Sequence, residues 1–115
     1  MANNIAFQPT GSTYKIALPT ANTAVTIEVA SDGIANQYLF GNHDAANKPV
    51  YARVGNANVA ATLPASGTPG NTVVVPANCK FVITGPQSNP SKTVYVSAIA
   101  EHNGAEVYVT PGEGL

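Results

Sequence analysis

Short runs of alternating apolar and polar residues constrain this chain more than any other feature of its sequence. In residues 23–29, the β-branched residues Val25, Ile27 and Val29 alternate with polar ones. Because successive side chains of a strand point to opposite faces, this spacing places all three on one face. Gly, Pro, Asn, Asp and Ser separate such runs, and no stretch keeps a helical period. The chain is therefore predicted to be all-β.

The runs predict about eight or nine short antiparallel strands, a number typical of β-sandwiches and jelly rolls. The expected strands cover residues 13–18, 23–29, 37–40, 50–54, 58–63, 72–75, 79–83, 93–101 and 105–110. A length of 115 residues fits one domain. We expect a single β-sandwich or jelly-roll-like domain over residues 12–110, an N-terminal arm over residues 1–11 and a C-terminal tail over residues 111–115.

The clearest local prediction is a hairpin at Asn103-Gly104, because this dipeptide suits a type I′ turn, in which both central residues have positive φ. In that register one face is apolar and is expected to lie in the core: Val94, Val96, Ala98, Ala100, Val107 and Val109. The opposite face is mixed: Tyr95, Ser97, Ile99, Glu101, Glu106 and Tyr108. A mixed face of this kind suits contact with another subunit.

The charge content also favours a protein that meets other proteins. Charged residues make up 10% of the chain and the net charge is -1, whereas roughly a quarter of a typical soluble chain is charged. Disorder does not explain this, because 44% of the residues are hydrophobic. Nucleic acid is not an expected partner, because the basic residues are scattered. They are Lys15, Lys48, Arg53, Lys80 and Lys92.

The sequence carries no signal for export or membrane insertion. The first residues lack the cationic start and apolar stretch of a signal peptide, and no apolar run approaches the roughly 20 residues of a membrane helix. Cys79 is the one cysteine, so no intramolecular disulfide can form. We therefore expect synthesis in a cytoplasm, no general secretory export and no membrane partner.

Two polar clusters are candidates for chemistry. Glu101, His102 and Glu106 could form a metal site or an acid–base pair, but zinc needs three or four converging ligands, so a solvated hairpin tip is favoured. The second cluster offers oxygen ligands for calcium, yet it lacks the acidic density of a calcium loop, so a turn is favoured. It comprises Asn42, His43, Asp44 and Asn47.

Cys79 shares a predicted strand face with Phe81 and Ile83, which favours a buried, inert thiol. No nucleophile elbow and no phosphate-cradling loop occurs. The sequence therefore predicts no catalytic residues, no cofactor-binding residues and no metal ligands. We expect no cofactor, and we expect that the protein is not an enzyme.

Aromatic and apolar side chains near the chain ends favour contacts with a neighbour. Burying Ile5 and Phe7 of the arm would remove them from water, and the tail either frays or docks. Five tyrosines without tryptophan suit a protein interface better than a sugar platform. The candidate subunit or capsid interface residues are Ile5, Phe7, Tyr95, Ile99, Tyr108 and Leu115.

Four segments carry a resemblance to a known class of protein: Asn4-Ile5-Ala6-Phe7-Gln8-Pro9, Tyr51-Ala52-Arg53-Val54-Gly55, Ala61-Thr62-Leu63-Pro64-Ala65 and Tyr108-Val109-Thr110-Pro111-Gly112-Glu113-Gly114. They resemble small β-rich virion proteins of tailed bacteriophages. The resemblance implies a capsid decoration or cement protein, made in the host bacterial cytoplasm, which sits on the capsid surface. It also implies the major capsid protein as partner and a homo-oligomer, with a trimer favoured.

Two alternatives stay open at this point. The chain could be a receptor- or glycan-binding knob of a head fibre or tail tip, which predicts glycan binding by the isolated protein. It could also be a head–tail joining or tail-completion protein, which predicts few copies per particle, whereas shell decoration needs hundreds.

Overall fold

The computed structural model describes residues 7–42 and 47–113, and in these ranges it contains strands and no helix. No helix there could cross a membrane. The strands are β1 (Gln8–Pro9), β2 (Tyr14–Leu18), β3 (Val25–Val29), β4 (Ala35–Asn42), β5 (Val50–Gly55), β6 (Val73–Val75), β7 (Cys79–Ser88), β8 (Val94–Ile99) and β9 (Ala105–Glu113). The all-β prediction is confirmed.

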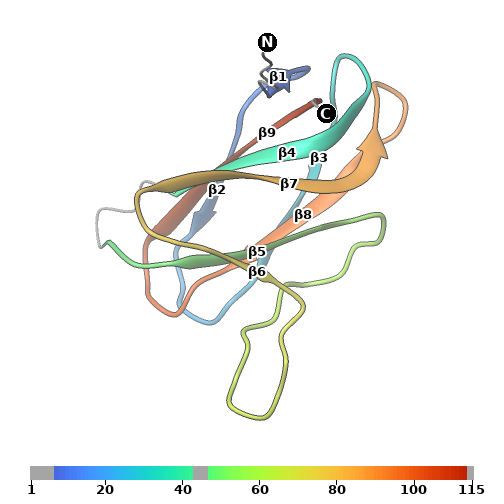
Figure 1. The fold of residues 1–115 in the computed structure, drawn as a ribbon. Coiled ribbons are helices and arrows are strands. Elements are labelled where there is room, and N and C mark those ends of the chain that lie inside the picture. The colour runs from blue at the N-terminus through green and yellow to red at the C-terminus, as the bar shows by residue number, and fades with distance from the viewer. Residues whose placement is uncertain (1–6, 43–46, 114–115) are drawn as a thin grey trace.

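The strands form two antiparallel sheets that lie face to face as a β-sandwich (Figure 1). One sheet has five strands in the order β1-β9-β4-β7, with β2 also paired to β9. The other has four strands in the order β3-β8-β5-β6. Strands β1 and β2 both flank β9, at different parts of its length.

The chain winds through these sheets as one long hairpin rolled up on itself. Strand β5 pairs with β6, β4 with β7, β3 with β8 and β2 with β9, so the outgoing half of the chain pairs with the returning half. From β2 onward, every connection except β5–β6 crosses from one sheet to the other. Strands far apart in sequence are therefore neighbours in each layer.

The core lies between the two sheets. Its side chains come from the inward face of each strand, as the alternation predicts. All six residues of the predicted apolar face are fully buried in it, and Val25 and Ile27 pack against it. The largest fully buried side chains are Tyr38, Phe40, Ile16 and Leu18.

The predicted β8–β9 hairpin is wrong, because the two strands lie in different sheets. Gly104 has φ 80° but Asn103 is not among the residues with positive φ, so the turn is not type I′. Instead, Asn103 Oδ1 accepts a hydrogen bond from Ala21 N (2.7 Å), and Gly104 N donates to the Leu18 carbonyl (3.0 Å). These bonds join the β8–β9 connection to the β2–β3 connection and to the end of β2. Each of these two connections crosses from one sheet to the other, so the apolar residues of the strands that it joins face each other across the core.

Other strands also differ from the sequence expectation. Residues 58–63 are not a strand, because their backbone is held by side chains such as Ser97 rather than by a ladder. Strand β7 continues past residue 83 to Ser88. Strand β9 runs through residues expected in the tail and ends at Glu113, because β4 and β1 pair with its last part.

Tyr38 places a hydroxyl group in the core, and the titration of this group gives a test of its burial. Its hydroxyl donates to the Pro86 carbonyl (2.5 Å) and lies 3.2 Å from Ser88 Oγ. Burial raises the pKa of this phenol above its ordinary value of 10.0, partly opposed by the Ser88 contact. The folded state therefore favours the neutral phenol, and the stability that this group contributes is full below pH 10 and is lost as the pH rises beyond it.

We expect Tyr38→Phe to flatten the fall in unfolding free energy between pH 10 and pH 11. Urea unfolding at several pH values measures this slope. Tyr95→Phe, on an outer face, is the matched control and should keep the wild-type slope. A Tyr38→Phe slope equal to that of wild type would contradict the assignment.

Candidate interface surface

The two outer faces of the sandwich differ in how far the chain itself covers them. On the outer face of the four-strand sheet, here called the four-strand face, the Ala61 backbone nitrogen donates to Ser97 Oγ (2.8 Å). Ser97 is only 1% exposed, and Ile99 on the same face is 6% exposed. The long β5–β6 connection therefore occupies part of this face.

The outer face of the five-strand sheet, here called the five-strand face, presents side chains to solvent. Most of its residues are partly or fully exposed, whereas Gly41 and Gly112 are buried. The alternation and register place these residues there: Lys15, Ala17, Gln37, Leu39, Gly41, Lys80, Val82, Thr84, Glu106, Tyr108, Thr110 and Gly112. This face is a mixture of apolar, aromatic, hydroxyl and charged groups.

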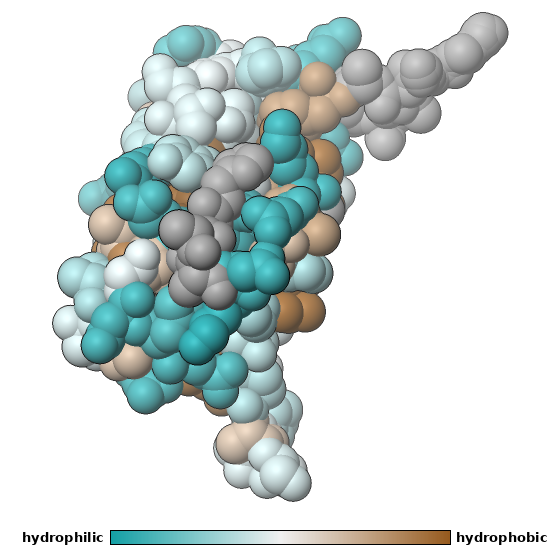
Figure 2. All heavy atoms as spheres, turned by 90° about the vertical axis from the view of Figure 1, so that its left-hand side faces the viewer, coloured by the Kyte–Doolittle hydropathy of each residue, from teal (hydrophilic) through white to brown (hydrophobic). Residues whose placement is uncertain are grey.

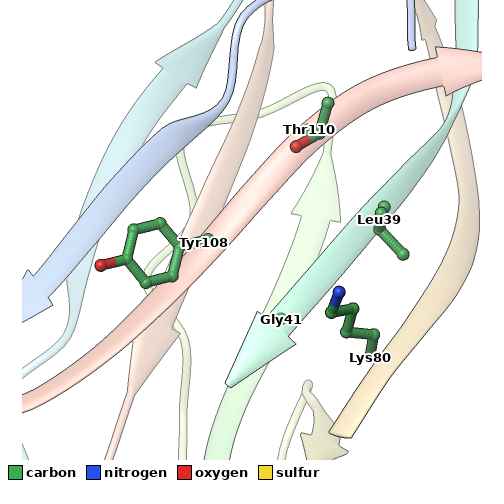
Figure 3. Close-up of a pocket in the computed structure, with 5 residues that line it drawn as sticks. All are labelled: Leu39, Gly41, Lys80, Tyr108 and Thr110. Atoms are coloured by element: carbon green, nitrogen blue, oxygen red, sulfur yellow. The ribbon is translucent and has the colours of Figure 1, made fainter. Parts of the chain in front are cut away.

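A shallow depression of about 160 Å³ lies near the middle of this face. The register puts Tyr108 on one side of Gly41 and Lys80 on the other. Because glycine has no side chain, Gly41 forms the floor of the depression. Leu39 and Thr110 complete the lining, and Figure 3 shows these side chains around Gly41 on β4, β7 and β9.

Charge is distributed unevenly across the five-strand face. Near β2, Lys15 Nζ lies 2.9 Å from Glu106 Oε2, and this hydrogen-bonded carboxylate raises the pKa of Lys15. Both side chains are exposed, so the pair contributes little to stability. Near β7, Lys80 forms no ion pair with a carboxylate of residues 7–42 or 47–113. The β7 side of the face thus carries a cation available to a partner.

The interface residues predicted from the hairpin do not lie together. Tyr108 is on the five-strand face, but Tyr95 and Ile99 are on the four-strand face, because β8 and β9 belong to different sheets. For the same reason Glu106 does not face Glu101. The single mixed face expected from the sequence is therefore wrong, and its members are divided between the two outer faces.

The first and last described residues contact each other within the molecule. Gln8 pairs with Glu113, Pro9 pairs with Gly112, and the partly buried ring of Phe7 lies against Gly112. The predicted interface residues Ile5 and Leu115 lie outside the described residues. Part of the predicted arm is thus a strand of the molecule's own sheet.

The two polar clusters that the sequence offers as candidates for chemistry lie in different parts of the fold. In the described part of the chain, no group of three potential metal ligands comes together. His43 and Asp44 lie outside that part. Figure 2 shows the end of the sandwich that carries the β8–β9 connection, and many hydrophilic residues gather there. The Glu101–His102 turn belongs to this hydrophilic end.

Asn42 is a structural residue, although the sequence around it predicts a turn. Its side chain is fully buried, and Nδ2 donates to the Lys48 carbonyl (2.9 Å) and to the Val75 carbonyl (3.1 Å). It therefore joins β4 to β6 and to the entry of β5. The signal was present in the spacing Tyr38, Phe40, Asn42, which continues the inward face of one strand.

Cys79 is exposed, so the prediction of a buried thiol is wrong. It is the first residue of β7, and β7 is the outermost strand of its sheet. The end residue of an edge strand has a neighbouring strand on one side only. Cys79 is therefore exposed although it belongs to an apolar strand pattern.

Comparison with known proteins shows a likeness in structure and none in sequence. No family model matches the chain, and no curated protein matches its sequence. Among solved structures, it is similar to a chain described under "Bacillus endospore appendages form a novel family of disulfide-linked pili". The likeness has a TM-score of 0.46 and 18% sequence identity, and covers 100% of this chain and 96% of that one.

Proposed function

We propose that this protein is a non-catalytic structural subunit that decorates and stabilises the capsid of a tailed bacteriophage, and that the five-strand face binds the shell. The observation that carries the choice of surface is the contrast between the two outer faces. The β5–β6 connection occupies part of the four-strand face, whereas most residues of the five-strand face are available to solvent. The choice of a capsid as partner rests on the resemblance to small virion proteins.

The proposal includes a jelly-roll fold. Its support is the winding, in which four successive strand pairs form one hairpin rolled into two sheets. Jelly rolls are double-sheet folds that recur in viral capsid domains. A sandwich of this kind is rigid, so little conformational entropy is lost when it binds.

The chemistry of the five-strand face suits a protein partner. Interfaces combine aromatic and apolar groups at the centre with polar and charged groups at the rim. Tyr108 supplies an aromatic body with a polar tip beside the depression, and Leu39 and Val82 extend the apolar surface. Lys80 offers a charge to an acidic side chain of the major capsid protein. Many copies on one shell make even a modest contact effective through avidity.

Removing the tyrosine ring or reversing the lysine charge tests the proposed surface. We expect Tyr108→Ala and Lys80→Glu each to weaken binding to purified capsids lacking this protein by about tenfold or more. Co-sedimentation with capsids measures the affinity. Tyr95→Ala, on the four-strand face, is the control and should bind as wild type does.

The same samples test the stabilising role. Capsids reassembled with the wild-type protein should withstand higher temperature than capsids without it, and capsids mixed with Tyr108→Ala should gain less. Equal affinity of all variants would refute the five-strand face as the binding surface. Unchanged heat tolerance on adding the wild-type protein would refute the cement role itself.

A glycan-binding role is the second candidate, and the depression at Gly41 favours it. Its lining combines an aromatic ring, a hydroxyl group and an ammonium group, which can stack on and hydrogen-bond a sugar. A glycan array with the isolated protein distinguishes the two roles. Glycan binding that Tyr108→Ala removes, without any capsid binding, would favour the second candidate.

A further inference from the structure

The two margins of the sandwich, where the edges of its sheets meet, differ in polarity. Strands β6 and β7 are the edge strands of their sheets and contact each other along one margin. Of the five large hydrophobic side chains exposed in the described residues, three lie on these two strands. They are Val73 (47% exposed), Val74 (45%) and Val82 (38%).

The opposite margin, formed by β2 and β3, carries charged groups. Lys15 on β2 is paired with Glu106, and Glu28 on β3 accepts a hydrogen bond from Thr93 Oγ1 (3.0 Å). Charged side chains on edge strands are a usual protection against pairing with another chain. The β6–β7 margin has less of this protection, because Lys80 is the only charged residue of its two strands.

Strand β7 is well suited to pair with another strand. It has 10 residues, and one side of its backbone ladder is taken up by β4 while the other is an edge. It runs along the front of the molecule in Figure 1. Exposed edge strands present a row of backbone donors and acceptors to which a further strand can be added.

We propose that the partner of β7 is β7 of a second copy of this chain, paired antiparallel about a two-fold axis at Val82. In this register Val82 lies opposite Val82 of the partner subunit, and Lys80 lies opposite Thr84 of the partner subunit. Apolar groups then meet at the axis, and the two lysines are kept apart. A register centred on Lys80 would instead oppose two like charges, which is unfavourable. The strand is therefore self-complementary, as a two-fold interface requires.

This pairing joins the five-strand sheets of the two copies into one sheet. Residues directly opposite in a ladder share a face, so both five-strand faces lie on the same side of the dimer. The contact goes beyond the proposed function, because the dimer forms in the absence of a capsid. It is two-fold, whereas the resemblance implies a trimer, and the molar mass of the assembly distinguishes the two.

A cysteine at the axis tests the contact directly. Opposite residues of an antiparallel pair have Cα atoms about 4.5–5.5 Å apart, within the usual range for a disulfide. In a Cys79→Ser background, we expect Val82→Cys to form a covalent dimer on mild oxidation, seen on a non-reducing gel. Ala17→Cys, exposed on β2 in the same background, is the control and should remain monomeric. Absence of the Val82 cross-link, or equal cross-linking of both variants, would overturn the proposal.

A charge at the axis gives an independent measurement without oxidation. Sedimentation velocity should show a dimer for the wild-type chain, and Val82→Glu should raise its dissociation constant at least about tenfold because two carboxylates then oppose each other. Ala17→Glu should leave the dimer unchanged, and circular dichroism should report the same β-fold for both variants. A wild-type chain that remains monomeric at millimolar concentration, or a Val82→Glu variant that dimerises as well as wild type, would refute the β7 contact.

Discussion

Replacing Asn42 with leucine is expected to lower the free energy of unfolding by about 2–4 kcal/mol, because it leaves two carbonyl oxygens without their donor. Asn42 is fully buried, and Nδ2 donates to the carbonyls of Lys48 and Val75. Leucine has a similar size but no hydrogen-bond donor. It would fill the space and keep water out, so the two carbonyls would have neither the amide nor water as a partner. For a chain of this length the melting temperature should fall by roughly 10–20 °C.

The same substitution at an exposed position of the same strand is the matched control. Asn36 lies on β4 and is exposed, so Asn36→Leu should change the unfolding free energy by less than about 0.5 kcal/mol. Thermal and urea unfolding measure both variants. If the two variants had equal stability, the hydrogen bonds of Asn42 would not be what joins β4 to β6.

Local alternation predicts strands well in this chain, because it reports a property of one strand at a time. Residues 23–29 contain β3, and its inward residues Val25, Ile27 and Val29 are those that the pattern selects. The six residues of the predicted apolar face are likewise in the core. Alternation shows only that one side of a strand is buried. That side is buried whether the strand pairs with its neighbour in a hairpin or with a distant strand in a sandwich.

The pairing of strands could not be obtained in the same way. Asn103-Gly104 favours a tight hairpin, in which β8 and β9 would put their apolar residues in one layer. The observed crossing places them in two layers that cover each other. Tertiary packing of the core therefore outweighs the local turn preference, and the position of Tyr95 and Tyr108 on different faces follows from it.

The candidate surface depends on that pairing and was largely hidden from the sequence. Leu39, Lys80 and Tyr108 belong to three strands that are separated along the chain and become neighbours only in the five-strand sheet. Of these three residues, the sequence predicts an interface role for Tyr108 alone, from its place on a mixed strand face. Gly41 carried no signal, because a glycine in a strand forms a depression only when larger residues are opposite it on both sides.

The contact of Phe7 and β1 with the last part of β9 gives the second large expected effect. A Cβ added to Gly112 would lie 2.5 Å from the carbonyl oxygen of Gln8 and would also meet the ring of Phe7. Because the backbone of β1 cannot move away without breaking its pairing with β9, Gly112→Ala should separate the two strands. Overpacking of this kind costs about 1–3 kcal/mol. We expect that loss in the unfolding free energy, together with faster proteolysis ahead of Tyr14.

Gly33→Ala is the control for this effect, since a Cβ there would meet nothing closer than Thr10 Cβ at 4.0 Å. Neither Gly33 nor Gly112 has positive φ, so both substitutions add a methyl group without backbone strain. Phe7→Ala separates the two contacts further, because it removes the ring but leaves the Gln8 carbonyl in place. Combining it with Gly112→Ala should recover only part of the lost stability. Full recovery would assign the clash to the ring alone, and wild-type stability of Gly112→Ala would show that β1 is not held against β9.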